Sequence, residues 1–251
     1  MSKSIEINTD IGEGYGEYKV ANDEELMNFV SSVNVACGFH AGDPMIMNNI
    51  VNLANQNNVK VGAHPSYDDF RGFGRRKMDL NDLEITNDTL YQLGALKSFT
   101  SFYDIPLSHV SPHGELGHAC IHNKNTALAF IEAVVKFDEK LEIYTQKGEL
   151  YEIAKKKGLN VKKQIFADRT YNDDGTLTSR KKEGSVINEL EGIMKQCIDM
   201  ILDKTVTSIN GKTINIEGEI LVVHSDTPGS EKISKKLLEG LKGKGIDVLN
   251  K

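Results

Sequence analysis

The strongest constraint on the fold of this chain is the alternation of short apolar segments, rich in β-branched residues, with segments of helical periodicity. Strands that alternate with helices form parallel sheets, because each crossover returns the chain to the same edge with a helix packed on the sheet. The sequence therefore predicts an α/β fold with a parallel sheet, although the pattern alone does not distinguish an open sheet from a closed barrel. The seven expected strands are 5–9, 32–36, 59–63, 107–110, 141–145, 161–166 and 220–224.

Capping signals mark where several helices should begin. Asn22 with Glu25, and Asn81 with Glu84, have the spacing of a capping box, in which each side chain bonds the backbone N–H of the other. Asp43 before a proline is a further start signal, because its carboxylate accepts from free N–H groups and proline fits the first helical position. The predicted helices are 23–33, 44–54, 82–103 and 230–242.

One segment departs from the parallel pattern. Residues 205–216 contain two short β-prone runs on either side of Asn210-Gly211, which predicts an antiparallel hairpin with a two-residue type I′ turn. The chain shows no fixed-period repeat and no low-complexity linker, and about 250 residues is a common size for one β/α barrel. Residues 1–251 are therefore expected to form a single domain with this hairpin added to it.

Charge and cysteine content limit the classes of partner. Thirty Lys and Arg against 36 Asp and Glu give a net charge of −6, which disfavours nucleic acid or an anionic membrane as a partner. No apolar run approaches the roughly 18 residues of a membrane-spanning helix. Cys37, Cys120 and Cys197 are odd in number and widely spaced, which is typical of free thiols and predicts a cytoplasmic location.

Polar residues are concentrated where the predicted strands end, which is the edge on which parallel α/β folds build their sites. Asp10, Glu13, His64 and His113 are the catalytic candidates, because carboxylates and imidazoles held together can exchange protons near neutral pH. Asp10, His64 and His113 would alternatively suit a divalent metal ion. The candidates for substrate binding at the same edge are Asn8, His40, Arg75, Asp168, Arg169 and Asp226.

Several common catalytic motifs are absent from the sequence. It contains neither the phosphate-binding loop of nucleoside triphosphatases nor the G-x-S-x-G elbow of serine hydrolases. The glycines around Glu13 do not have dinucleotide-binding spacing. Cys37 fits a buried structural thiol better than a nucleophile, and Asp43 fits a helix cap better than a catalyst.

Eight segments of the chain follow a recognisable pattern. They read N-x-DIGE at 8–13, NVACGFHAGD at 34–43, GAHP at 62–65, GFGRR at 72–76, YQLGAL at 91–96, FADR-x-Y at 166–171, DGTL at 174–177 and H-x-DTP at 224–228. Together they resemble the family of the 5-oxoprolinase A subunit, a lactam-utilisation, YcsF-like family. The resemblance runs in register from about residue 5 to 230, and the ten-residue block from Asn34 to Asp43 is its most specific part.

The resemblance implies a distorted, seven-stranded parallel β/α barrel, similar to that of glycoside hydrolases and deacetylases, with the site at the carboxyl ends of the strands. It implies that the chain hydrolyses 5-oxo-L-proline to L-glutamate with ATP and Mg²⁺, together with 5-oxoprolinase subunits B and C. In that role Asp10, Glu13, His64 and His113 would be the acid–base groups, and Arg75 or Arg169 would hold the substrate's anion.

The chain departs from the family pattern after the fourth predicted strand. The family usually has H-V-K-P-H-G-A-L-Y there, whereas this chain has Ser111, Glu115 and Gly117 in place of the lysine, the alanine and the tyrosine. The family's cysteine is Thr9 here, and a glycine is Ser225. Two alternative functions stay open: a paralogue with no catalysis or an altered substrate, and a metal-dependent amide hydrolase or deacetylase.

Overall fold

The structure, a computed structural model, describes residues 4–250. Its strands are β1 (Ser4–Ile11), β2 (Ser32–Ala36), β3 (Lys60–His64), β4 (Leu107–Val110), β5 (Glu142–Thr145), β6 (Val161–Phe166), β7 (Thr205–Thr207), β8 (Thr213–Asn215), β9 (Ile220–Val223) and β10 (Asp247–Val248). Its helices are α1 (Asp23–Leu26), α2 (Pro44–Asn57), α3 (Asp82–Phe102), α4 (Gly114–His122), α5 (Lys124–Asp138), α6 (Glu149–Lys156), α7 (Leu190–Ile198) and α8 (Ser230–Gly243), with a 3₁₀ turn η1 (Phe70–Gly72) and a π-helical turn η2 (Asp199–Asp203).

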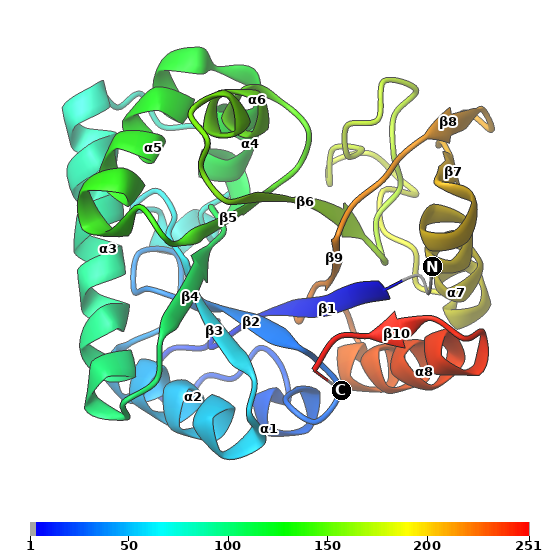
Figure 1. Ribbon diagram of the computed structural model, residues 1–251, viewed down its shortest axis with the longest axis horizontal. Coiled ribbons are helices and arrows are strands. Elements are labelled where there is room, and N and C mark those ends of the chain that lie inside the picture. The colour runs from blue at the N-terminus through cyan, green and yellow to red at the C-terminus, as the bar shows by residue number, and fades with distance from the viewer. Residues whose placement is uncertain (1–3, 251) are drawn as a thin grey trace.

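The strands close into a parallel barrel (Figure 1). Within residues 4–250 the order is β1, β2, β3, β4, β5, β6 and β9, and β9 pairs back onto β1 from Glu6 with Ile220 to Thr9 with Val223. This last pairing decides between the open sheet and the closed barrel, and it confirms the seven-stranded barrel. The short strand β10, which the sequence did not indicate, pairs with the first residues of β1 beside the barrel.

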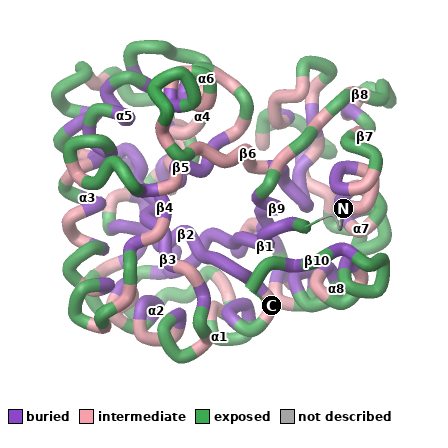
Figure 2. Tube along the Cα trace, viewed as in Figure 1, coloured by how far each residue is buried: buried purple, intermediate pink, exposed green. Residues whose placement is uncertain are grey.

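Apolar side chains fill the layer between the barrel and its helices. Figure 2 shows β1 and β2 buried, β6 mostly half-buried and the outer faces of the helices exposed. Helices α3 and α5 pack against each other and bury Leu93, Leu96, Phe130 and Val134. Burial of each such side chain stabilises the fold by about 1.5 to 3 kcal/mol. Among residues 4–250, none of the helices has the length and apolar character that crossing a membrane requires.

The predicted caps are confirmed. The Asp43 carboxylate accepts from the backbone N–H groups of Met45 and Ile46, and Asn81 forms the full capping box with Glu84. Helix α8 also begins directly after residue 229. Each cap satisfies N–H groups that the first turn of a helix leaves without partners, so local sequence suffices to place these helix starts.

The first helix is much shorter than predicted. The side chain of Asn22 caps it as expected, but α1 ends at Leu26, and Val33 belongs to β2, where it pairs with Thr9 of β1 and with Val61 of β3. The same apolar residues fit a helical stripe and a buried strand, and pairing with strands on both sides favours the strand.

The hairpin of β7 and β8 is confirmed, but its turn type was predicted wrongly. Gly211 has a positive φ of 82°. Asn210 does not belong to the few non-glycine residues between 4 and 250 whose φ is positive. A type I′ turn needs positive φ at both positions. The N–H of Gly211 donates instead to the carbonyl of Ser208, and the N–H of Ser208 donates to Lys212, so the turn is longer and uses only the glycine in the left-handed region.

Candidate active site

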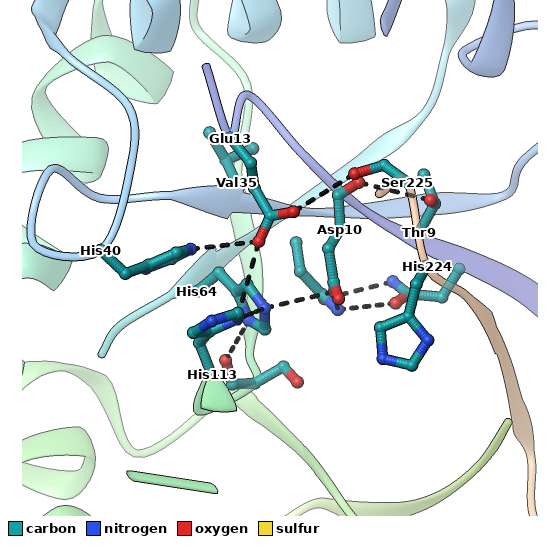
Figure 3. A network of polar contacts seen from close by, with 12 residues as sticks. Thr9, Asp10, Glu13, Val35, His40, His64, His113, His224 and Ser225 are labelled. Carbon is teal, nitrogen blue, oxygen red and sulfur yellow. Dashed lines mark hydrogen bonds and ion pairs between the residues drawn. The ribbon is translucent and has the colours of Figure 1, made fainter. Parts of the chain in front are cut away.

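Five buried polar side chains gather at the carboxyl end of the barrel (Figure 3). Asp10 lies near the end of β1 and His64 ends β3. Glu13, His40 and His113 stand on the loops that follow β1, β2 and β4. Each of the five is at most 6% exposed, so the cluster is shielded from solvent. The structure therefore brings together all four predicted acid–base candidates and adds His40.

Glu13 lies at the centre of this cluster. Its Oε1 is 3.1 Å from Nε2 of His40 and 3.6 Å from Nδ1 of His113. Its Oε2 accepts a 3.3 Å hydrogen bond from the hydroxyl of Ser225, which follows β9. The backbone at Gly12 has a φ of 69°, a left-handed conformation that glycine adopts without a Cβ penalty. The glycine before Glu13 thus permits the turn that directs this carboxylate over the barrel.

Backbone carbonyls fix the protonation of two histidine rings. His64 Nδ1 lies 2.6 Å from the carbonyl of Ser111, and His113 Nε2 lies 2.9 Å from the carbonyl of Phe73. A carbonyl only accepts, so each of these nitrogens carries a proton. The other nitrogens of the two rings, His64 Nε2 and His113 Nδ1, face each other at 3.0 Å. A hydrogen bond between them needs a proton on one of the two nitrogens. Asp10 lies 3.3 Å from His64 Nε2, closer than Glu13 lies to His113 Nδ1, and this places the proton on His64.

Asp10 forms an ion pair with His64. Its Oδ1 lies 3.3 Å from His64 Nε2 and accepts a 2.8 Å bond from Nδ2 of Asn34. Burial alone would raise the pKa of Asp10, but the charge and the hydrogen bond of His64 hold it well below its usual range. Burial alone would lower the pKa of His64, and the carboxylates of Asp10 and Glu13 raise it instead. The pair is therefore charged.

The remaining groups of the cluster have pKa values displaced in other directions. Burial, followed by the charge of Asp10, raises the pKa of Glu13 to about 7. Burial lowers the pKa of His40 and His113 well below the ordinary value, and the nearby His64 cation adds to this effect. Near neutral pH, His40 and His113 are neutral, and only Glu13 is close to half protonated. Such a spread of pKa values among neighbouring groups is typical of acid–base sites.

The same cluster can also hold a metal ion. Glu13, His40, His64 and His113 each offer one ligand atom, and these atoms all lie within 4.8 Å of one another. Three imidazoles and one carboxylate suit a first-row divalent ion. The carbonyl bonds of His64 and His113 would orient those rings as outer partners do in metal sites. The metal set predicted from sequence differs, because Asp10 pairs with His64 instead of joining these four residues.

Asn34 of β2 orients Asp10 from inside the barrel. Its Oδ1 accepts from Asn8 Nδ2 at 3.2 Å and from His109 Nε2 at 2.8 Å, so its Nδ2 must point the other way. That nitrogen donates to Asp10 and to Asn8 Oδ1, the latter at 2.7 Å. Asn8, a predicted substrate-binding residue, also donates to Ser32 Oγ at 2.8 Å. Its amide is thus engaged below the cluster by other side chains of the barrel.

The mouth of the barrel carries arginines and a shared carboxylate. Arg75 Nη2 lies 2.7 Å from Oδ2 of Asp226, and Arg180 Nη2 lies 3.4 Å from Oδ1 of the same residue. The guanidinium of Arg75 also lies over the ring of Phe73, 4.9 Å from its centroid. Burial by itself raises the pKa of Asp226, but the charges of Arg180 and Arg75 lower it below its usual value.

Asp168 and Arg169 are predicted substrate-binding residues that bond to other parts of the chain. Asp168 accepts from Thr227 Oγ1 at 2.5 Å and lies 2.9 Å from Nδ1 of His224. Arg169 donates from Nε to the carbonyl of Ser185 at 3.0 Å and from Nη2 to that of Thr178. Asp168 therefore ties the loop after β9 to the end of β6, and Arg169 fixes the loop 178–185.

Sequence reasoning missed three residues of this region. Asn34 was recognised only as part of the ten-residue block, and Ser225 only as a departure from the family pattern. Arg180 lies in a polar, basic segment, and no local signal indicates its approach to Asp226. Cys37 is buried and donates to the carbonyl of Val35, and burial raises the pKa of its thiol to about 12, which agrees with a structural cysteine.

The fold and the site together define a β/α-barrel protein with a buried acid–imidazole centre at the carboxyl ends of its strands. The chain matches the model of the LamB/YcsF family over residues 5–250, and it belongs to that family. It is 47% identical over 245 residues to the 5-oxoprolinase A subunit of Campylobacter jejuni subsp. doylei, covering 97% of this chain and 96% of the relative. It is 43% identical to the protein of the same name from Pyrococcus furiosus, covering 98% and 96%.

Solved structures agree with this assignment. The lactam utilization protein from Thermus thermophilus superimposes with a TM-score of 0.92 at 36% identity, and 98% of each chain is covered. A T48 deacetylase has a TM-score of 0.51 at 11% identity, covering 99% of this chain and 88% of the deacetylase, and it shares the fold alone. The family resemblance and the distorted barrel predicted from the sequence are both confirmed.

Proposed function

We propose that this chain is the A subunit of an ATP-dependent 5-oxoprolinase that hydrolyses 5-oxo-L-proline to L-glutamate with its partner subunits B and C in the cytoplasm. The observation that carries the proposal is the buried cluster of Glu13, His40, His64, His113 and Asp10 in a chain that is 47% identical to a 5-oxoprolinase A subunit. That relative is named as one subunit of its enzyme, which supports an assembly with partners.

Glu13 is the group we assign to proton transfer. Opening the lactam requires a proton to leave the attacking water and a proton to reach the ring nitrogen. A group whose pKa lies near the working pH does both most effectively. The pKa of Glu13, raised to about 7 by burial and by Asp10, meets that condition. Ionised Asp10 keeps His64 charged, and this cation would stabilise negative charge on the reacting oxygen.

ATP activates the lactam, because a five-membered lactam is an unreactive amide and phosphorylation of its carbonyl oxygen makes the carbon electrophilic. Hydrolysis of ATP also supplies the driving force for ring opening. This sequence lacks a phosphate-binding loop, so we assign part of the binding of ATP and Mg²⁺ to the partner subunits. This division makes the isolated chain inactive and the reconstituted complex active.

The test measures glutamate formed from ATP and 5-oxo-L-proline by the chain with its partner subunits. Glu13→Gln removes the titrating carboxyl and should lower kcat by about 10²- to 10⁴-fold. His113→Asn should also lower kcat, because it removes the imidazole that faces His64 Nε2 at 3.0 Å and lies beside Glu13. Matched controls are Glu24→Gln and His118→Asn, at exposed positions. Wild-type complex that yields no glutamate would refute the proposal.

The four-residue cluster favours a second candidate, a metal-dependent amide hydrolase or deacetylase. Its donor set fits a divalent ion that would polarise an amide carbonyl. Elemental analysis of the purified chain separates the two candidates. The metal-dependent hydrolase is supported if the chain holds one equivalent of a first-row metal and has amidase activity without ATP. Dialysis against a chelator should then remove the metal and the activity together. Metal-free protein that supports glutamate formation eliminates this candidate.

Ser111 is the basis of a third candidate, a paralogue with a changed substrate or no catalysis. Its carbonyl orients His64, but its hydroxyl accepts from Gln164 Nε2 at 3.1 Å, where the family has a lysine. Gly117 also fits tightly here, since a Cβ would lie 2.6 Å from the carbonyl oxygen of Pro112. If Ser111→Lys creates 5-oxoprolinase activity that the wild-type chain lacks, this candidate replaces the first.

A further inference from the structure

Three arginines converge at the mouth of the barrel beside the acid–imidazole cluster. Arg75 comes from the loop after β3, Arg169 from the end of β6, and Arg180 from the loop that follows it. Arg75 and Arg180 share the carboxylate of Asp226, and their side chains are 33% and 28% exposed. Both can therefore reach a ligand at the mouth without leaving Asp226.

The charges of this region do not balance. Asp226 is the shared anion of Arg75 and Arg180, and Asp168 is already engaged by His224 and Thr227. Burial lowers the pKa of Arg169 to about 10, and the positive charges of Arg180 and Arg75 add to the effect. The mutual repulsion of the guanidinium groups would be relieved by an incoming anion.

The loop after β9 joins the arginines to the cluster. Ser225 and Asp226 of this loop also line a cavity of about 410 Å³, whose other walls are residues 19–22 and 227–231 and which none of the three arginines lines. The hydroxyl of Ser225 bonds Oε2 of Glu13 at 3.3 Å, while the neighbouring Asp226 bonds both arginines. Two consecutive residues thus connect the mouth of the barrel to the acid–base cluster and to the arginines.

We propose that Arg180 is a specificity-determining residue, which together with Arg75 binds the carboxylate of 5-oxo-L-proline at the mouth of the barrel. This inference rests on the proposed function. The planar guanidinium fork matches a carboxylate, and Arg75 and Arg180 each use Nη2 on Asp226, which leaves other N–H groups for the ligand. Asp226 acts as a positioning residue that holds the two forks side by side.

The chemistry of the ligand fits this arrangement. In 5-oxo-L-proline the carboxylate and the lactam carbonyl are carried by the two carbons that flank the ring nitrogen. A carboxylate held by Arg75 and Arg180 at the mouth would leave the lactam group free to enter toward Glu13. A phosphate group of ATP offers similar chemistry, so the experiment must separate the two anions.

The experiment measures steady-state kinetics of the reconstituted complex with Arg180→Gln, Arg180→Lys and the control Arg71→Gln, whose arginine lies on the turn η1. Arg180→Gln should raise KM for 5-oxo-L-proline by about 10- to 150-fold, as loss of a hydrogen bond to a charged group does, and change kcat much less. Arg180→Lys should be intermediate because it keeps the charge without the fork. KM for ATP should not change.

A competition measurement with 2-pyrrolidinone, which has the lactam but no carboxylate, provides the second test. Its inhibition constant should be the same for wild type and Arg180→Gln, since it has no carboxylate that Arg180 could bind. The inference is overturned if KM for 5-oxo-L-proline is unchanged in Arg180→Gln. It is equally overturned if KM for 5-oxo-L-proline and the inhibition constant of 2-pyrrolidinone rise together, because this indicates general damage to the site. A rise in KM for ATP instead also overturns it, because this indicates a phosphate site.

Direct binding separates failure of this inference from failure of the proposed function. If the wild-type complex forms no glutamate, the proposed function is refuted, and calorimetric titration of the chain with 5-oxo-L-proline still tests the arginine pair. Binding that Arg180→Gln weakens by about 10-fold or more supports the pair as a carboxylate site. Equal affinity in both proteins, or no binding to either, overturns it.

Discussion

Replacing Asn34 by aspartate should test the polar connection between the barrel interior and the cluster. Asn34→Asp changes almost no volume, but an oxygen replaces the Nδ2 that donates to Asp10 at 2.8 Å and to Asn8 Oδ1 at 2.7 Å. The new carboxyl is fully buried, beside an ionised carboxylate. Both burial and the charge of Asp10 disfavour its ionisation, so its pKa in the folded protein lies above that in the unfolded chain.

The size and sign of the effect follow from proton linkage. In the window above the unfolded pKa of about 3.9, the unfolded chain loses a proton that the folded protein retains, so stability falls as pH rises. The slope is up to about 1.4 kcal/mol per pH unit, and it ends at the folded pKa. A folded pKa raised by about two to three units therefore costs about 3 to 4 kcal/mol at pH 7. Below about pH 4 the protonated carboxyl can donate to Asp10, and the cost should be small.

Urea unfolding of wild type and Asn34→Asp at intervals between pH 4 and pH 8 measures this dependence. Asn87→Asp, on the exposed face of α3, is the matched control and should show little difference from wild type. If the loss in the free energy of unfolding is the same at pH 4 and pH 7, the argument that ionised Asp10 and burial raise the pKa of a carboxyl at position 34 is wrong.

Three further predictions concern other parts of the fold. Tyr144→Phe removes the donor to Glu6 at 2.8 Å and should cost about 1.5 to 3 kcal/mol in urea unfolding at pH 7, and less in acid where Glu6 is protonated. Gly62→Ala puts a Cβ 2.1 Å from Nε2 of His109, so its cost of about 1 to 3 kcal/mol should shrink in a His109→Ala background. Ellman's reagent should label none of the three buried cysteines before denaturation and all three afterwards.

The local chemistry of the sequence was enough to place much of the framework. The caps at Asp43 and Asn81 and the seven strands were predicted because capping and apolar periodicity involve residues close in the chain. The same signals gave the wrong extent for α1, because pairing of β2 with strands distant in sequence decides where that helix ends. They also gave the wrong turn at Asn210, because residue type alone does not specify the backbone conformation there.

The candidate residues at the strand ends were also predictable, since parallel strands of one barrel present their carboxyl ends on the same side. Their pairing was not: that His64 bonds Asp10, or that His40 joins Glu13, depends on which loops meet above the barrel. The loop of Arg180 carries no periodic signal that could indicate its contact with Asp226.

The sequence by itself determined the alternation of strands and helices, the starts of the capped helices and the kinds of side chain available at one edge. Only the tertiary structure decided that β9 pairs with β1 to close the barrel, and that Asn34 directs its amide toward Asp10. The reason is physical: caps and periodicity act over a few residues, whereas burial, charge and hydrogen-bond direction are set by segments that meet only when the barrel closes.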